Sequence, residues 1–102
     1  MTDEAEVTTA ASEVVLGSRI SSADIESLHA SLTDAAASDA DMTVDVSGVT
    51  LIDTPAIQLL MCAARDQARR GRQFFLKGES GAFSEAVSLL GLTQEVNSWS
   101  TQ

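Results

Sequence analysis

The periodicity of the sequence changes across one stretch, Ser47-Gly48-Val49-Thr50-Leu51-Ile52-Asp53-Thr54-Pro55-Ala56. Before it, between residues 40 and 46, apolar side chains alternate with polar ones, which is typical of a strand with one buried face. After it, apolar residues recur at the spacing of an amphipathic helix, at Ile57, Leu60, Met61, Ala64 and Ala68. The stretch is therefore predicted to join a strand to a helix.

The helix start within this stretch is indicated by three residue types. Thr54 suits the N-cap position, because its hydroxyl can accept a hydrogen bond from a backbone N–H one turn into the helix. Pro55 suits the first helical position, since it has no N–H and its φ is already helical. Asp53 then lies at the positive end of the helix dipole. These roles explain the three residues as a capped helix start without any further function.

The same alternation of strand and helix patterns continues on both sides. Upstream, Glu13–Leu16 is predicted to be a strand, and a helix with apolar positions from Ile25 to Ala36 follows a Ser21–Asp24 capping pattern. Downstream, a strand is predicted at Phe74-Phe75-Leu76, and a helix follows that begins at Ser80 and has apolar positions Phe83, Ala86, Val87 and Leu90. Residues 93–102 are interpreted as a short last strand or a frayed end. This order of elements predicts an α/β domain.

Length and composition restrict the class of protein. The chain has 102 residues, of which 44% are hydrophobic, so we expect a single domain over residues 13–102 behind a flexible acidic tail at 1–12. A formal net charge of −9 argues against nucleic-acid binding. The longest apolar run has six residues, which excludes a membrane-inserted helix, and the acidic amino terminus is unlike a secretory signal, so a cytoplasmic protein is expected. One cysteine and one histidine cannot form a zinc site, and no cofactor is expected.

Charge is distributed unevenly along the chain, an asymmetry that can steer the approach of a protein partner. Residues 1–53 carry eleven acids and one base, whereas residues 54–102 carry four acids and five bases. Cys62 is interpreted as a small core residue and His29 as a packing or surface residue, because neither has a partner that would favour chemistry. The predicted core includes Ile57, Leu60, Met61, Phe74, Val87 and Leu90.

The residues around the junction resemble the core motif of the STAS domain (sulfate transporter and anti-sigma factor antagonist) family. That motif is a strand ending in Asp-Leu-Ser-Gly-Val, an apolar pair, Asp-Ser-Ser-Gly or Asp-Thr-Gly-Gly, and an apolar helix. The similar residues here are Val44–Thr54 and Ile57–Leu60, with further similarity at Gly71–Phe74 and Leu89–Leu92. The resemblance covers roughly residues 13–96 and implies a STAS-like fold, a mixed central sheet of about four strands with helices packed alongside.

The resemblance implies a binding module rather than an enzyme. In similar bacterial members, the first hydroxyl residue after the motif aspartate is phosphorylated by a partner serine/threonine kinase, often an anti-sigma factor, and the unphosphorylated form binds that partner. This implies that Thr54 is the phosphoacceptor, and that the partner, an anti-sigma factor or a chemotaxis-type component, contacts Asp53, Thr54, Pro55, Ala56 and Asp24. A monomer or weak dimer is expected.

Two alternatives to this function remain open. The first is an accessory STAS subunit that docks on the ATPase of a lipid-transport ABC transporter, because some such subunits carry Asp-Thr at this junction. The second, a small enzyme, has little support, since the sequence has no phosphate loop and no nucleophile–base constellation, and no catalytic residue is assigned.

The sequence departs from the family pattern in two places. Pro55 and Ala56 stand where the family usually has Ser-Gly or Gly-Gly, which bears on kinase access to Thr54. The family's usual first hairpin is reduced to residues 14–17, so one strand is expected to be missing.

Overall fold

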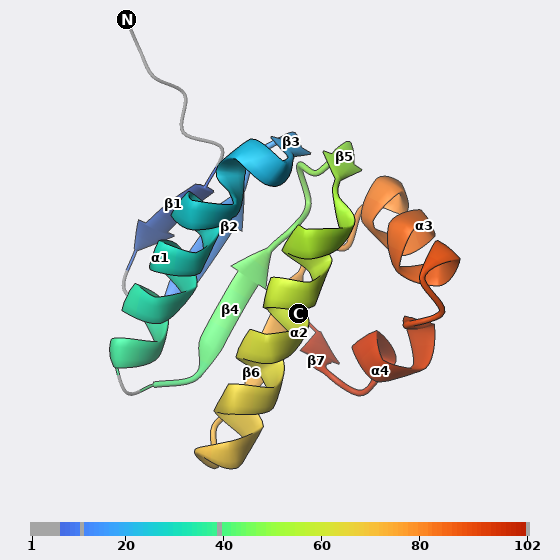
Figure 1. Cartoon of the computed structure of the whole chain (residues 1–102). Coiled ribbons are helices and arrows are strands. Elements are labelled where there is room, and N and C mark those ends of the chain that lie inside the picture. The colour runs from blue at the N-terminus through green and yellow to red at the C-terminus, as the bar shows by residue number, and fades with distance from the viewer. Residues whose placement is uncertain (1–6, 11, 39, 102) are drawn as a thin grey trace, which may run out of the picture.

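The computed structural model describes residues 7–10, 12–38 and 40–101, and it is an α/β domain built on a five-stranded sheet (Figure 1). The strands lie in the order β1-β2-β4-β6-β7, and a separate pair is formed by β3 and β5. In chain order the elements are β1 (Val7–Ala10), β2 (Glu13–Leu16), β3 (Arg19–Ile20), the 3-10 turn η1 (Ser22–Asp24), α1 (Ile25–Ala37), β4 (Met42–Asp45), β5 (Leu51–Ile52), α2 (Thr54–Arg69), β6 (Phe74–Lys77), α3 (Gly81–Leu89), α4 (Thr93–Asn97) and β7 (Ser100–Thr101).

The sheet is mixed, as predicted. β1 runs antiparallel to β2, while β2, β4, β6 and β7 are parallel to their neighbours. The register aligns Val14 with Val44 and Val44 with Leu76, and all three are buried. Because side chains alternate between the two faces of a strand, this row lies on one face of the sheet, and its burial indicates the face that α1 and α2 cover (Figure 1). On the opposite face Val15 is 38% exposed.

The predicted core is confirmed at Ile57, Leu60, Met61, Phe74 and Val87, all of which are buried. Leu90 was predicted to be buried and is instead 38% exposed. It is the C-cap of α3, and the chain then reverses at Gly91, whose φ is 73°. The amide of Leu92 donates to the carbonyl of Val87 and that of Gly91 to the carbonyl of Ser88, which is a Schellman ending. Leu92, beyond the reversal, packs against the core in place of Leu90.

The prediction that Cys62 is a core residue is wrong, because its side chain is exposed. Successive residues of a helix are rotated by about 100°, so position 62 turns away from the face that carries Leu60 and Met61. Gln67 is buried instead, and its Nε2 donates to the carbonyls of Ala40 and Gln73, each at 3.3 Å. A polar residue therefore occupies the end of the apolar stripe, where Ala68 was expected.

The structure also corrects the predictions at both ends of the chain. The expected tail over residues 1–12 includes a strand, Val7–Ala10, which pairs with β2, so the first hairpin of the fold is present. Residues 1–6 and 11 lie outside the described part. At the other end, the segment interpreted as a strand or a frayed end forms both α4 and β7. None of the described helices has the length and apolar character needed to cross a membrane.

Candidate functional site

The start of α2 differs by one residue from the predicted start. Asp53 is the N-cap, with φ −82° and ψ 156°, and Thr54 is the first helical residue. Thr54 was predicted to be the N-cap, but Pro55 is equally compatible with the second helical position, so the chain enters the helix one residue earlier. Thr54 is exposed, and within the described part of the chain its hydroxyl makes no hydrogen bond.

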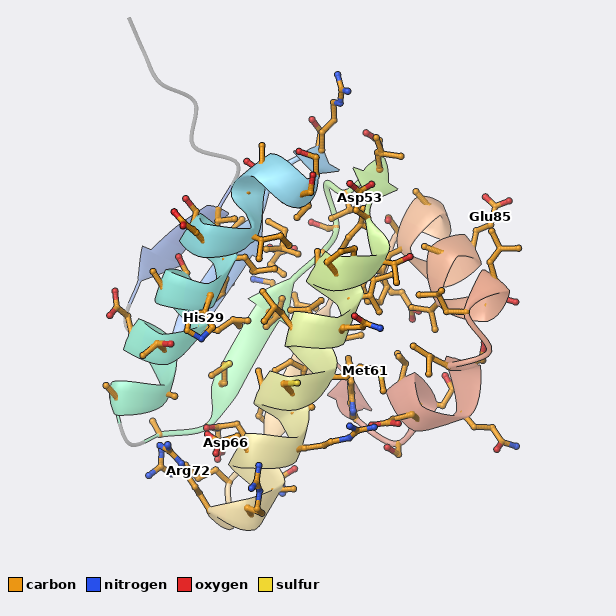
Figure 2. The ribbon with its side chains drawn as sticks, in the orientation of Figure 1. His29, Asp53, Met61, Asp66, Arg72 and Glu85 are labelled. Atoms are coloured by element: carbon orange, nitrogen blue, oxygen red, sulfur yellow. The ribbon has the colours of Figure 1, made fainter. Side chains whose placement is uncertain are left out.

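The carboxylate of Asp53 connects the starts of two helices rather than capping its own. Its Oδ2 accepts a hydrogen bond from the backbone N–H of Ser22, in η1, at 3.1 Å. Its backbone N–H donates to the carbonyl of Ile20 at 2.9 Å. Figure 2 shows Asp53 where α2 begins, at the end of the molecule that also carries β3 and η1. The residue before Thr54 is therefore fixed on both its backbone and its side chain.

Asp24 has a local structural role at the same end of the molecule. Its Oδ2 accepts from the backbone N–H and the hydroxyl of Ser21, at 2.9 and 3.2 Å, which completes the predicted capping box. Asp24 is half-buried and belongs to η1, the turn whose Ser22 N–H donates a hydrogen bond to Asp53. The structure thus brings two predicted site carboxylates, Asp24 and Asp53, to adjoining segments.

The other two predicted docking residues differ in their exposure to solvent. Pro55 is exposed beside Thr54, but Ala56 has no exposed surface and is part of the core. Its inclusion in a docking surface was wrong, because position 56 starts the buried face of α2. Asp53, Thr54 and Pro55 are therefore the contiguous surface at this helix start; we refer to these three residues as the junction surface.

The carboxyl ends of β4 and β6 border this region. Ser47, after β4, donates from its N–H and hydroxyl to Asp45 Oδ1, at 2.9 and 2.7 Å. These two hydrogen bonds, with a nearby Lys77 charge, hold the pKa of the Asp45 carboxyl below its usual range. Gly78 approaches Ser47 so closely that a Cβ at position 78 would lie 2.5 Å from the Cβ of Ser47. The loops after β4 and β6 are thus packed against each other.

Comparison with known proteins identifies the family. A family model described as "Mlab, STAS domain" matches residues 5–97. The chain belongs to the STAS domain family. No curated protein matches the sequence. Among solved structures, the anti-sigma factor antagonist SpoIIAA in its unphosphorylated form matches with a TM-score of 0.62 and 13% identity, covering 80% of this chain and 78% of that one. At that identity the match establishes a shared fold.

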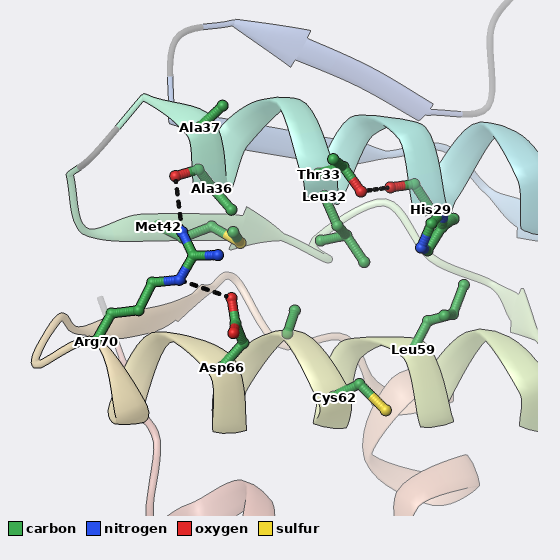
Figure 3. Close-up of a pocket in the computed structure, with 11 residues that line it drawn as sticks. His29, Leu32, Thr33, Ala36, Ala37, Met42, Leu59, Cys62, Asp66 and Arg70 are labelled. Carbon is green, nitrogen blue, oxygen red and sulfur yellow. Dashed lines mark hydrogen bonds and ion pairs between the residues drawn. The ribbon is translucent and has the colours of Figure 1, made fainter.

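This STAS domain also has a groove that sequence analysis did not reveal. The groove lies between α1 and α2, encloses about 330 Å³ and has an apolar floor that includes Leu32, Met42 and Ala63 (Figure 3). Arg70 closes one end, with its Nε 3.1 Å from Asp66 Oδ2. On α2 the groove is lined by residues from Leu59 to Asp66, so it begins more than one helical turn beyond Thr54. Its lining residues come from two helices and a strand, so no sequence motif signals it.

The titratable residues of this STAS domain offer no metal site in the described part of the chain. No three His, Cys, Asp or Glu side chains in residues 7–10, 12–38 and 40–101 are grouped so that they could hold an ion. His29 is exposed and lines the groove, as does Cys62. The chemistry available at the junction surface is therefore that of one hydroxyl and one carboxylate at a helix N-terminus.

Proposed function

We propose that this STAS domain is a non-catalytic bacterial signalling module that binds a partner protein through the start of α2 and is regulated by phosphorylation of Thr54. The observation that carries the proposal is the exposed hydroxyl of Thr54, which makes no hydrogen bond in the described part of the chain and directly follows Asp53 in the family's motif. Such a hydroxyl is accessible to a kinase and to a partner.

A phosphate at Thr54 is compatible with the fold. It adds about −1.5 to −2 charges at pH 7. The N-terminus of the 16-residue helix α2 favours an anion through the positive end of the helix dipole, although Pro55 has no N–H and the N–H of Ala56 donates to the carbonyl of Asp53. We therefore expect the domain to stay folded while the junction surface becomes strongly negative, which changes what it can bind.

The proposed partner is a serine/threonine kinase of the anti-sigma factor type or a chemotaxis-type component. Support comes from the family and from the shared fold with a protein described as an anti-sigma factor antagonist. A cytoplasmic location and a monomeric or weakly dimeric state belong to the same proposal. No catalytic residue and no cofactor are assigned.

A second candidate is an accessory subunit that docks permanently on the ATPase of a lipid-transport ABC transporter. Pro55 and the buried Ala56 favour this candidate, because the helix start lacks the glycine that would let a kinase backbone approach closely. The two candidates differ in the state of Thr54, which is phosphorylated in cells under the first and unmodified under the second. Affinity purification from the native organism, followed by mass spectrometry, reads the partner and that state together.

Thr54→Glu is expected to weaken partner binding by about tenfold or more, because a negative charge enters a docked surface. Thr54→Gln is the matched control, because glutamine has the shape of glutamate without its charge, and this variant should retain most of the affinity. Isothermal titration with the purified partner measures both, and circular dichroism should be nearly native for each variant. Equal affinities for the Glu and Gln variants would contradict the phosphorylation switch.

The uneven charge distribution predicts which residues govern the rate of association. Asp53 belongs to the junction surface, whereas Arg69 is sixteen residues further along the chain, about 24 Å along the α2 axis at 1.5 Å per residue. That distance exceeds the screening length of about 8 Å at physiological salt. Asp53→Asn should therefore lower the association rate, and Arg69→Gln should leave it nearly unchanged.

Stopped-flow association rates across a salt series test this prediction. The rate for the unaltered chain should fall as ionic strength rises. Asparagine keeps an oxygen that can accept from Ser22, so the variant removes the charge and retains the hydrogen bond. A flat salt dependence, or a larger effect at Arg69 than at Asp53, would show that the acidic side does not face the partner.

A further inference from the structure

The segment before α1 is joined to the segment before α2 by a ladder of hydrogen bonds. The carbonyl of Ser18 accepts from the N–H groups of Thr50 and Leu51, at 2.7 and 3.0 Å. The carbonyl of Ile20 accepts from the N–H of Asp53 at 2.9 Å. The last contact reverses direction, because the N–H of Ser22 donates to the side chain of Asp53 at 3.1 Å.

This last contact differs from the others in its chemistry and its place. The rungs at Ser18 and Ile20 join neutral backbone groups, while the Ser22 rung ends on a carboxylate. It is exposed, and it is one residue away from Thr54. A new charge at Thr54 therefore acts first on this rung.

We propose that the η1 turn is a second part of the switch: a negative charge at Thr54 releases Ser22 from Asp53, so that η1 shifts together with the junction surface. This inference rests on the proposed function, because it gives the modification of Thr54 a structural consequence. The Ser22–Asp53 hydrogen bond is the element that has two arrangements, closed and open. The regulation is then a local rearrangement as well as a change of charge.

Two effects of a phosphate at Thr54 favour the open arrangement. The phosphate repels the adjacent carboxylate of Asp53, since like charges disfavour each other at short range. Its three oxygens are strong acceptors and compete with Asp53 for nearby N–H donors. The Asp53 side chain does not cap α2, and Ser22 is the one hydrogen-bond partner it has in the described chain. Once that contact opens, nothing else in the described residues retains the carboxylate.

The turn that is released lies on the surface. Ser22 and Ala23 are exposed, and the Ser21–Asp24 capping box keeps the turn itself intact when its attachment to Asp53 is lost. The turn would therefore move as a unit relative to α2. A partner that contacts both η1 and the junction surface senses the change in their relative position.

Hydrogen exchange at the Ser22 amide in the free domain tests the inference. In Thr54→Glu the exchange rate should rise about tenfold or more over Thr54→Gln, since a hydrogen bond to a charged group is lost. The amides of Thr50 and Leu51 serve as internal controls and should be unchanged between the two variants. In an Asp53→Ala background, where the rung is absent, Ser22 should exchange fast in both variants. A chain with phosphothreonine at position 54, made by ligation, should behave like the Glu variant.

The outcomes separate this inference from the proposed function. Equal Ser22 exchange in the Glu and Gln variants, with native circular dichroism, overturns the inference even where partner binding is lost. Faster exchange at Ser22, Thr50 and Leu51 alike also overturns it, because the whole ladder has then loosened. Faster exchange confined to Ser22 supports the inference, and if partner affinity stays unchanged in that case, it is the proposed function that fails.

Discussion

Leu60→Ala is expected to lower the free energy of unfolding by about 2–5 kcal/mol, which is the range for removing a buried leucine side chain. Leu60 has no exposed surface and lies on the face of α2 that is buried in the core. The cost combines lost apolar burial with the cavity that remains, because the closely packed neighbours relax only in part. Since a domain of this size is stable by about 5–15 kcal/mol, this one change should remove a large share of its stability.

Denaturant unfolding measures this effect, with the fluorescence of Trp99 as the probe. Trp99 is the single tryptophan of the chain and packs edge-on against Phe74, with ring centroids 4.9 Å apart. Leu89→Ala is the matched control, because Leu89 is 81% exposed and its truncation should change stability by no more than about 0.5 kcal/mol. A cost below about 0.5 kcal/mol at Leu60 would mean that this face of α2 is not packed on the sheet.

Gly78→Ala is expected to destabilise the domain by about 2–4 kcal/mol, through a strained backbone and a steric clash together. The φ of Gly78 is +67°, a region that residues with a Cβ rarely adopt. The added methyl group would also lie 2.5 Å from the Cβ of Ser47 and 3.3 Å from its Cα, so the loop after β4 must shift. Because that loop leads into β5 and α2, partner affinity should fall as well.

Gly71→Ala separates the two contributions to this cost. Gly71 has a similar φ of +74°, but a Cβ there would meet nothing within 4 Å. Its replacement should therefore cost about 1–2 kcal/mol, from backbone strain alone. Thermal or denaturant unfolding of both variants provides the comparison. Equal losses at the two positions would show that the predicted clash between a Cβ at position 78 and Ser47 adds nothing to the cost of the substitution.

The elements that the sequence predicted well are those whose periodicity is strong. β4 and α2 carry clear period-two and helical patterns, because each buries one face against the core. The ends of α3 were also predictable, since the Ser80 cap and the Gly91 reversal depend on local residue types. Patterns of this kind report local geometry and burial together.

The elements that the sequence missed depend on partners far away in the chain. β1 is a strand because its backbone pairs with β2, and the sequence of residues 7–10 carries no clear alternation. α4 has five residues and a single buried one, Val96, which is too few for a helical stripe. Its contact with α2 includes the Arg65–Glu95 ion pair, whose members lie thirty residues apart in the sequence.

The candidate site was predictable in its position and less so in its contacts. The motif around Asp53 and Thr54 located the junction, because the helix start and the family pattern coincide there. The hydrogen bond between Ser22 and Asp53 joins residues 31 positions apart, and no local pattern encodes it. The burial of Ala56 likewise follows from how α2 sits on the sheet, which residue type alone does not determine.

The exposure of Cys62 makes the domain suitable for site-specific labelling without any mutation. It is the single cysteine of the chain, and it is exposed at the groove between α1 and α2, eight residues after Thr54. At 1.5 Å per residue the two positions are about 12 Å apart along the helix. A maleimide dye at Cys62 would thus be near enough to report the arrival of a partner and far enough away to leave Thr54 accessible. Energy transfer from Trp99 to that dye would follow the same event with two native residues.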